Sequence, residues 1–301
     1  MLTDDKDKNV STFRTRSFLL LALYVCWGTA IPAMKIMVET FPPMAGAALI
    51  FLLGGIVLAA MSWNRARPEA RKVRQLALAG VSMLVGGQGL AMIALTEVTA
   101  SVGAILAAAI PLWIVVLSAL IGARVSFGSL VRLVIGFAGI AVVIFTAPDA
   151  SSGGAPWAIG VFCVAPVLWA AGSLLTAHTE QPFDLMVGTS IQLLAGGACL
   201  ASLSIVTGEL ADIGSYRISS LSAGAAVYLL IFDSLIGFLL YTRLLNTVPP
   251  QIVGSYAYVT PIIGAVVGAF FFDEPIWFGA ILGGAMVISV VALELREGYE
   301  K

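Results

Sequence analysis

Charged residues are scarce in this chain. Of its 301 residues only 11% are Asp, Glu, Lys or Arg, whereas 59% are hydrophobic, and the mean hydropathy is +1.00. A soluble domain of this length does not carry so large an apolar fraction, because its surface needs polar residues. The shortage of charge therefore excludes a soluble globular protein and predicts one that crosses a membrane several times.

The parts needed for common enzymatic chemistry are also missing. His178 is the single histidine, the three cysteines lie inside apolar stretches without a CxxC pair, and the sequence has no GxxxxGK[ST], GxSxG or HExxH motif. Zinc sites, catalytic triads and ATP-binding loops depend on those parts. We therefore predict that the chain is not an enzyme and that it carries no cofactor and no metal.

Ten apolar stretches, each of about the 20 residues that a bilayer-spanning helix requires, follow one another along the chain. They cover residues 18–38, 44–63, 76–96, 100–121, 127–147, 157–177, 185–206, 221–245, 251–272 and 276–294. The prediction is an all-α polytopic membrane protein with ten transmembrane helices. Its expected parts are a tail (1–17), a five-helix half (18–147), a Pro/Gly/Ser linker (148–156), a second half (157–296) and a tail (297–301).

Two of these stretches carry proline at the same place. Pro111 in the fourth and Pro261 in the ninth align when the halves are offset by 150 residues (261 − 111), which indicates a duplication. Proline frees the carbonyl four residues earlier, and lipid tolerates that only where protein or a water-filled cavity receives it. With Pro32 and Pro166 in the first and sixth stretches, these prolines predict helix breaks that serve gating, and the duplicated break points to a transport site between the two copies.

Basic residues predict the orientation in the membrane. With the N-terminus inside, 14 of the 16 Lys and Arg residues face the cytoplasm, and only Lys35 and Arg217 face outward. This positive-inside bias places both termini in the cytoplasm, and it explains the basic segment 64–75 without a nucleic-acid partner. Because each half has five spans, the second half enters the membrane from the opposite side, so the repeat is inverted, as in many secondary transporters.

Asp233 lies near the middle of the stretch 221–245. A charged side chain at that depth is costly unless it faces a cavity or a partner, so we predict that Asp233 couples proton movement to transport or binds a cationic group. The alternative is a neutral carboxyl that links two helices. Tyr241 follows two turns later on the same face, with Gly237 between them, and this pattern suggests a groove.

Other polar and aromatic side chains inside the spans are candidates for the same site. Lys35 could draw anionic groups into an outer vestibule or extend to the membrane interface, and Trp27 lies on about the same helix face. Gln88, in a glycine-rich segment, could bond a neighbouring helix or a ligand. The predicted substrate-binding set is Trp27, Lys35, Gln88, Trp113, Trp169, Asp233, Tyr241 and Tyr258.

Several local sequences resemble one known family. WGTAIPAMK (27–35), followed by FPP (41–43), resembles the first helix of the drug/metabolite transporter superfamily, EamA branch. LWAAGSLL (168–175) resembles its sixth helix, and the stretch from Tyr241 through Pro261 to the acidic turn 273–275 resembles its eighth and ninth helices. The chain departs from the family pattern in its second helix, where Ile50 stands in place of the usual arginine.

The resemblance implies an inverted five-plus-five repeat around a cavity lined by helices 1, 3, 4, 6, 8 and 9, in the inner membrane of a bacterium. It implies export of small organic metabolites, such as aromatic or other amino acids, by alternating access. Two alternatives stay open: a multidrug or cation exporter, and an uncoupled carrier or channel. The expected partners are a small-molecule substrate and the lipid bilayer, and the chain is expected to act as a monomer or weak dimer.

Overall fold

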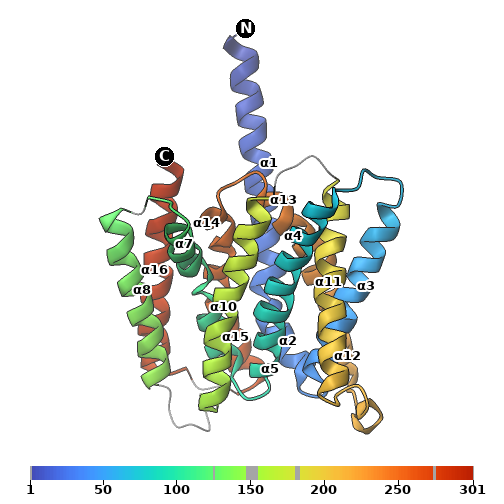
Figure 1. Cartoon of the computed structure of the whole chain (residues 1–301). Coiled ribbons are helices and arrows are strands. Elements are labelled where there is room, and N and C mark those ends of the chain that lie inside the picture. The colour runs from blue at the N-terminus through green and yellow to red at the C-terminus, as the bar shows by residue number, and fades with distance from the viewer. Residues whose placement is uncertain (1, 125, 147–154, 180–183, 274–275, 301) are drawn as a thin grey trace.

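The computed structural model describes residues 2–124, 126–146, 155–179, 184–273 and 276–300, and every regular element in these ranges is a helix (Figure 1). Seven helices in this part of the chain are long and apolar enough to cross a membrane, and three shorter apolar helices accompany them. All of them fall on stretches that hydropathy singled out. The all-helical, membrane-spanning prediction is confirmed, while the count of ten spans stays a prediction.

The first half contains three spans that are built from more than one helical piece. Its elements are α1 (Leu2–Gly28), α2 (Ala30–Val38), α3 (Pro43–Met61), α4 (Ala70–Gly80), η1 (Val81–Gly89), α5 (Leu90–Ala94), α6 (Ala100–Ala107), α7 (Ile110–Leu120) and α8 (Phe127–Thr146). The first span joins α1 to α2, the third joins α4, η1 and α5, and the fourth joins α6 to α7. Since α1 begins at Leu2, the expected N-terminal tail continues the first span as helix and projects beyond the bundle (Figure 1).

The second half contains two spans built from more than one helical piece, and its first span, α10 (Pro156–Ala177), is continuous. Its elements are α10 (Pro156–Ala177), α11 (Leu185–Val206), η2 (Ile213–Ser215), α12 (Ser220–Tyr228), η3 (Leu229–Gly237), α13 (Phe238–Leu245), α14 (Pro250–Val253), η4 (Gly254–Tyr258), α15 (Val259–Phe271) and α16 (Phe278–Glu300). Residues 148–154 of the expected linker and residues 274–275 of the acidic turn lie outside the described ranges.

The prolines differ in what they do to their helices. Ahead of Pro111 the helix stops at Ala107 and resumes at Ile110, and ahead of Pro261 it passes through the 3₁₀ segment η4. The first span is interrupted at Thr29, three residues before Pro32. The expected break at Pro166 is wrong, because α10 runs unbroken through that residue. A single missing N–H donor does not end a helix of 22 residues whose other hydrogen bonds remain.

Helices from the two predicted halves pair with each other throughout the bundle. The most extensive contacts join α3 with α11, α8 with α16, α6 with α15, and η1 with α10. Glycine allows the α8–α16 pair to come together, because a Cβ on Gly139 would lie 2.8 Å from the carbonyl oxygen of Gly283. Gly283 belongs to one of the sequence's GxxxG pairs, and here it packs helices within the chain.

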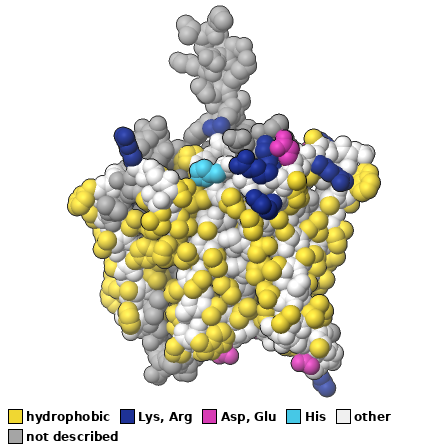
Figure 2. Space-filling view, in the orientation of Figure 1, with side chains coloured by type: hydrophobic (Ala, Val, Ile, Leu, Met, Phe, Trp, Pro, Cys, Tyr) yellow, Lys and Arg dark blue, Asp and Glu magenta, His cyan; other side chains and the backbone are white. Residues whose placement is uncertain are grey.

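The surface separates into an apolar flank and one basic end. Large side chains such as Leu120, Val206 and Phe270 are 76%, 82% and 82% exposed, as expected for residues that face lipid. The two chain ends lie at the same end of the bundle (Figure 1), and most of the Lys and Arg side chains visible in Figure 2 gather at that end. The bundle therefore has the apolar flank and the charged end that are expected of a membrane protein.

Candidate functional site

Two spans contain a π-helical segment of nine residues, η1 in the third span and η3 in the eighth. π-helical turns are rare and are frequently found at functional sites, because they widen the helix and redirect its side chains. Each segment carries one buried polar residue with a long or charged side chain, Gln88 in η1 and Asp233 in η3. Each π-helical segment therefore places one such polar side chain in the interior of the bundle.

Gln88 and Asp233 form a direct hydrogen bond between the two segments. The Nε2 atom of Gln88 donates to Oδ1 of Asp233 at 3.1 Å, and the side chains are only 7% and 1% exposed. The indole Nε1 of Trp27 donates to the backbone carbonyl of Asp233 at 3.3 Å. The other side-chain oxygens, Oε1 of Gln88 and Oδ2 of Asp233, are buried and have no hydrogen-bond partner among the described residues. Two acceptors in the centre of the bundle are thus unused.

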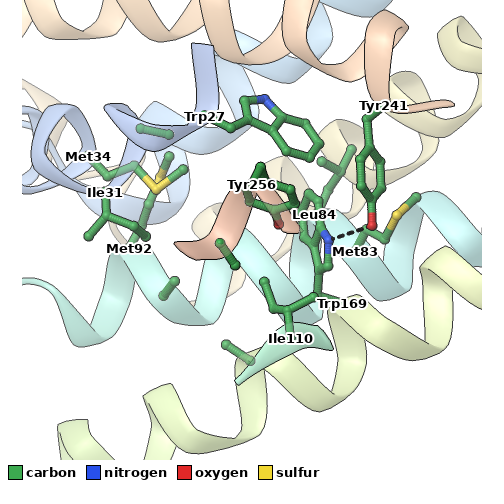
Figure 3. Close-up of a cluster of buried hydrophobic side chains, with 14 of the residues drawn as sticks. Trp27, Ile31, Met34, Met83, Leu84, Met92, Ile110, Trp169, Tyr241 and Tyr256 are labelled. Atoms are coloured by element: carbon green, nitrogen blue, oxygen red, sulfur yellow. Dashed lines mark hydrogen bonds between the residues drawn. The ribbon is translucent and has the colours of Figure 1, made fainter. Parts of the chain in front are cut away.

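Four aromatic rings pack around Trp27, and three of them, those of Trp169, Tyr241 and Tyr256, are labelled in Figure 3. The ring centroid of Trp27 lies 5.3 Å from that of Trp169, 4.6 Å from that of Tyr241 and 4.9 Å from that of Tyr256, in tilted or edge-to-face arrangements. Such arrangements favour aromatic pairs beyond their buried area. Together with Phe238 these four residues form what we call the aromatic cluster.

The hydroxyl of Tyr241 fixes one side of the aromatic cluster. It accepts a hydrogen bond from Nε1 of Trp169 at 3.1 Å and lies 2.7 Å from the hydroxyl of Ser173 (Figure 3 shows the bond to Trp169). Tyr241 and Ser173 are both fully buried. Since a buried hydroxyl without partners would cost stability, these bonds hold the ring in one orientation.

Glycine seats the two tryptophans on the π-helical segments. A Cβ on Gly87 of η1 would lie 2.6 Å from the ring of Trp169, and a Cβ on Gly237 of η3 would collide with Nε1 of Trp27. Each tryptophan therefore packs directly against a segment of the other predicted half. Any larger residue at either glycine would push the indole away.

A cavity lies beside the Gln88–Asp233 pair. Its empty volume is about 500 Å³, which includes the open space at its mouth. Its walls are mostly apolar, and they include Ile31, Met34, Gln88, Phe162, Asp233 and Tyr256. The lining residues come from α1, α2, η1, α5, α6, α7, α10, η3, η4 and α15. Along α10 and η3–α13, Ser173 and Tyr241 lie nearer than the cavity to the end where the chain termini lie (Figure 1). The aromatic cluster therefore closes the cavity on that side.

The structure brings together most of the residues predicted for a site, but not all of them. Trp27, Gln88, Trp169 and Asp233 line the cavity, as does Pro166, and Tyr241 lies directly behind. Within the described ranges no three His, Cys, Asp or Glu side chains come together in a way that could hold a metal ion.

Lys35 and Trp113 do not line this cavity, so their part in substrate binding stays a prediction. The ammonium of Lys35 donates to the carbonyl of Leu95 at 2.8 Å, at the C-terminal end of α5, where the helix dipole favours a cation. Trp113 turns outward and packs edge-on against Phe137 of α8, with ring centroids 5.2 Å apart. The side chain of Tyr258 lies outside the described residues.

Tyr256 lines the cavity but is absent from the predicted set. It lies in the 3₁₀ segment η4, two residues before Tyr258, and packs against both Trp27 and Tyr241. Ser173 is missed as well, although it follows Trp169 by four residues and so shares its helix face. The i, i+4 spacing from Trp169 was a sequence signal for Ser173. The 3₁₀ geometry that orients Tyr256 has no such signal in the sequence.

A helical membrane bundle with a central cavity, a buried acid and interrupted helices defines the class of polytopic membrane transporters. The chain belongs to the EamA-like transporter family, whose model matches it twice, over residues 15–145 and 156–295. It is therefore a membrane transporter with a small-molecule substrate and a lipid surround.

Curated relatives agree with this assignment. The chain is 31% identical to the inner membrane transporter YedA of Escherichia coli K12 over 284 residues, covering 92% of this chain and 89% of that one. It is 25% identical to the transporter YvbV of Bacillus subtilis, with coverage of 93% and 92%. One crystal structure matches with a TM-score of 0.66 at 19% identity, covering 95% of this chain and 98% of that chain, and supports the fold alone.

Proposed function

We propose that the protein is a secondary transporter that exports small organic metabolites from the cytoplasm through its central cavity. The observation that carries the proposal is the Gln88–Asp233 pair, buried beside a cavity and supplied by two π-helical segments. A carboxyl at such a depth is expensive to maintain, so a functional role for it is the default expectation. Asp233 is the candidate for proton coupling.

The proposed architecture is ten spans in two inverted halves of five. The double match of the family model supports two copies, one in each half. Contacts such as α3 with α11 and α8 with α16 join spans at equivalent places in the two copies, as a pseudo-two-fold axis in the membrane plane would require. Because the cavity is lined by both halves of a single chain, a monomer is sufficient for transport.

The proposed orientation places both termini in the cytoplasm. The grouping of Lys and Arg at the end where both chain ends lie supports this under the positive-inside rule (Figure 2). On that orientation the aromatic cluster is the barrier between the cavity and the cytoplasm. Transport then requires a second arrangement in which the cluster opens and the outer side of the cavity closes.

A carrier fits the cavity better than a channel does. A channel needs a continuous polar path or a filter, whereas here the apolar cavity ends against five packed aromatic rings. Alternating access needs no such path, since the two halves rock around a fixed site. The family resemblance suggests amino acids, among them aromatic ones, as substrates, and the cavity itself, with apolar walls and one acid, suits a ligand with an amine.

Counterflow is the experiment that tests the proposal. Purified protein in liposomes preloaded with unlabelled phenylalanine, leucine or tyramine should take up the matching labelled compound transiently above equilibrium for at least one of them. Protein-free liposomes measure passive permeation. A folded, monodisperse protein that exchanges none of the three would overturn the proposal, and uptake without the transient overshoot would indicate a channel instead.

A further inference from the structure

Resting on the function proposed above, we infer that the cavity selects organic amines that join an ammonium group to an apolar or aromatic body and lack a carboxylate. The inference concerns the substrate class and not the transport cycle. Its basis is the kind of polar group that the cavity offers.

The polar pair has two unused acceptor oxygens and carries no positive charge. A carboxylate can only accept hydrogen bonds, so the contact with Asp233 orients the Gln88 amide with its nitrogen toward the acid. That orientation leaves Oε1 of Gln88 and Oδ2 of Asp233 as acceptors without a partner among the described residues. An ammonium group has three donors and no acceptor, so it matches oxygens of this kind.

The aromatic walls suit the same group. Trp27, Trp169 and Tyr256 line the cavity together with Asp233, and the rings of Trp27 and Tyr256 are 4.9 Å apart. A cation over such rings is attracted by their quadrupoles, most strongly where water is excluded. Met34 and Phe162 line the rest of the wall and would receive the apolar body of the ligand.

A carboxylate on the ligand finds no cationic side chain in the described lining. The described lining contains no Lys, Arg or His, and Lys35 donates to the Leu95 carbonyl instead. A second carboxylate in the same small space would repel Asp233. A ligand that carried one would therefore lose affinity relative to the matching amine.

Backbone amides at the interrupted fourth span do not change this picture. A helix N-terminus can receive an anionic group, and α7 begins beside the cavity. However, the amides of Ala108 and Ala109 already donate to carbonyls of the preceding turn, and Pro111 has no N–H. The break therefore adds few donors to the site.

Three matched ligands test the inference: phenethylamine, phenylalanine and 3-phenylpropionate, which carry the amine, both groups, and the carboxylate alone. Isothermal titration calorimetry on the detergent-purified full chain should give phenethylamine about tenfold or more tighter binding than phenylalanine, because the extra carboxylate is repelled. No heat of binding is expected for 3-phenylpropionate. Equal or tighter binding of phenylalanine, or no binding of phenethylamine, would overturn the inference.

Paired variants separate the acid from its surroundings. Asp233→Asn should weaken phenethylamine binding about tenfold or more and leave phenylalanine little changed, since the charge that attracts one part of that ligand repels another. Ser234→Ala is the matched control, because Ser234 is also buried in η3 but donates its hydrogen bond to the Ile50 carbonyl of α3. The Ser234→Ala protein should bind phenethylamine as tightly as the wild type does. Undiminished phenethylamine binding by a folded Asp233→Asn protein contradicts the inference.

The calorimetry and the counterflow experiment fail independently. If phenylalanine exchanges across liposomes while phenethylamine does not bind, the transporter proposal stands and the substrate class is wrong. If phenethylamine binds but none of the panel exchanges, the ligand class stands and the transport proposal is overturned.

Discussion

The two π-helical segments are alike in length and depth but differ in their surroundings. In the most apolar part of the span that contains η1 (Ala70–Ala94), 61% of the residues are buried. In the span that contains η3 (Ser220–Leu245) the corresponding share is 33%. Gly86, Gly87 and Gly89 of η1 press against side chains of α10 and α11. In η3 the outer residues Ile231 and Ile236 are 39% and 42% exposed.

This difference indicates a division of tasks between two similar pieces. The η1 segment is held tightly by its neighbours and provides an uncharged amide, which orients the acid. The η3 segment provides the charge and has one face free of protein contacts. We expect η3 to be the more mobile of the two, since it has fewer packed neighbours to displace.

Replacing the acid removes the principal difference between the segments and should have the largest effect. With Asp233→Asn both segments carry an amide, and the loss of a buried charge that pairs with a cationic ligand costs about 2–5 kcal/mol. Counterflow of labelled tyramine in proteoliposomes should fall by a factor of about 30 or more. Protein-free liposomes give the blank, and unchanged flux and affinity in the variant would show that Asp233 is only a link between helices.

Filling the two glycine seats tests whether the segments tolerate equal disturbance. Gly87→Ala and Gly237→Ala each force an indole away, Trp169 in the first case and Trp27 in the second, at a cost of about 1–3 kcal/mol in unfolding free energy. We expect the greater cost at Gly237, where an added Cβ would also lie 2.6 Å from the backbone carbonyl oxygen of Phe232.

Thermal denaturation of the purified variants measures that difference. Gly224→Ala is the control in the same span as Gly237, because a Cβ there meets no atom within 4 Å. A loss of stability at Gly224 equal to that at Gly87 would show that the effect is not one of crowding.

Removing the amide of η1 should have a smaller effect than removing the acid. Gln88→Leu keeps the volume but leaves Oδ1 of Asp233 without its donor, at a cost of about 1–3 kcal/mol. Calorimetry should show about tenfold weaker binding of phenethylamine, because the acid is no longer oriented. If Gln88→Leu weakens binding as much as Asp233→Asn does, the two segments contribute equally and the division of tasks is wrong.

The smallest effect is expected in the aromatic cluster that joins the segments. Tyr241→Phe removes a hydroxyl that bonds Trp169 and Ser173, and it should lower the unfolding free energy by about 1 kcal/mol. Tyr216→Phe is a control at a position that is 39% exposed. A Tyr241→Phe protein as stable as the control would mean that ring packing alone fixes the cluster.

Hydropathy was enough to predict where the helices lie, because length and apolar content are what a bilayer demands of a span. It could not predict η1 and η3. A π-helical turn differs from an α-helical turn in a hydrogen-bond pattern that packing against neighbours selects, and no residue type enforces it. The same holds for α10, where neither the sequence GVFCVAPVL nor the presence of Pro166 distinguishes a kink from a break.

Depth in the membrane was enough to place two predicted residues at the candidate cavity, whereas helix rotation, which the sequence does not fix, decided the position of two others. Asp233 and Gln88 are polar residues at mid-span, so burial of their side chains demanded partners wherever they pointed. Lys35 and Trp113 depend on which way a helix face turns, and that is set by contacts with α5 and α8. Their sequence neighbours Met34 and Leu112 are buried instead.

Trp27 packs on Gly237 and Trp169 packs on Gly87, so each of the two proposed halves holds an indole of the other in place. The two indoles also pack against each other, with their ring centroids 5.3 Å apart. A movement that lifts one indole from its glycine displaces the ring against which the other is braced. Opening of the barrier should therefore be all-or-none, with no stable state in which only one half has let go.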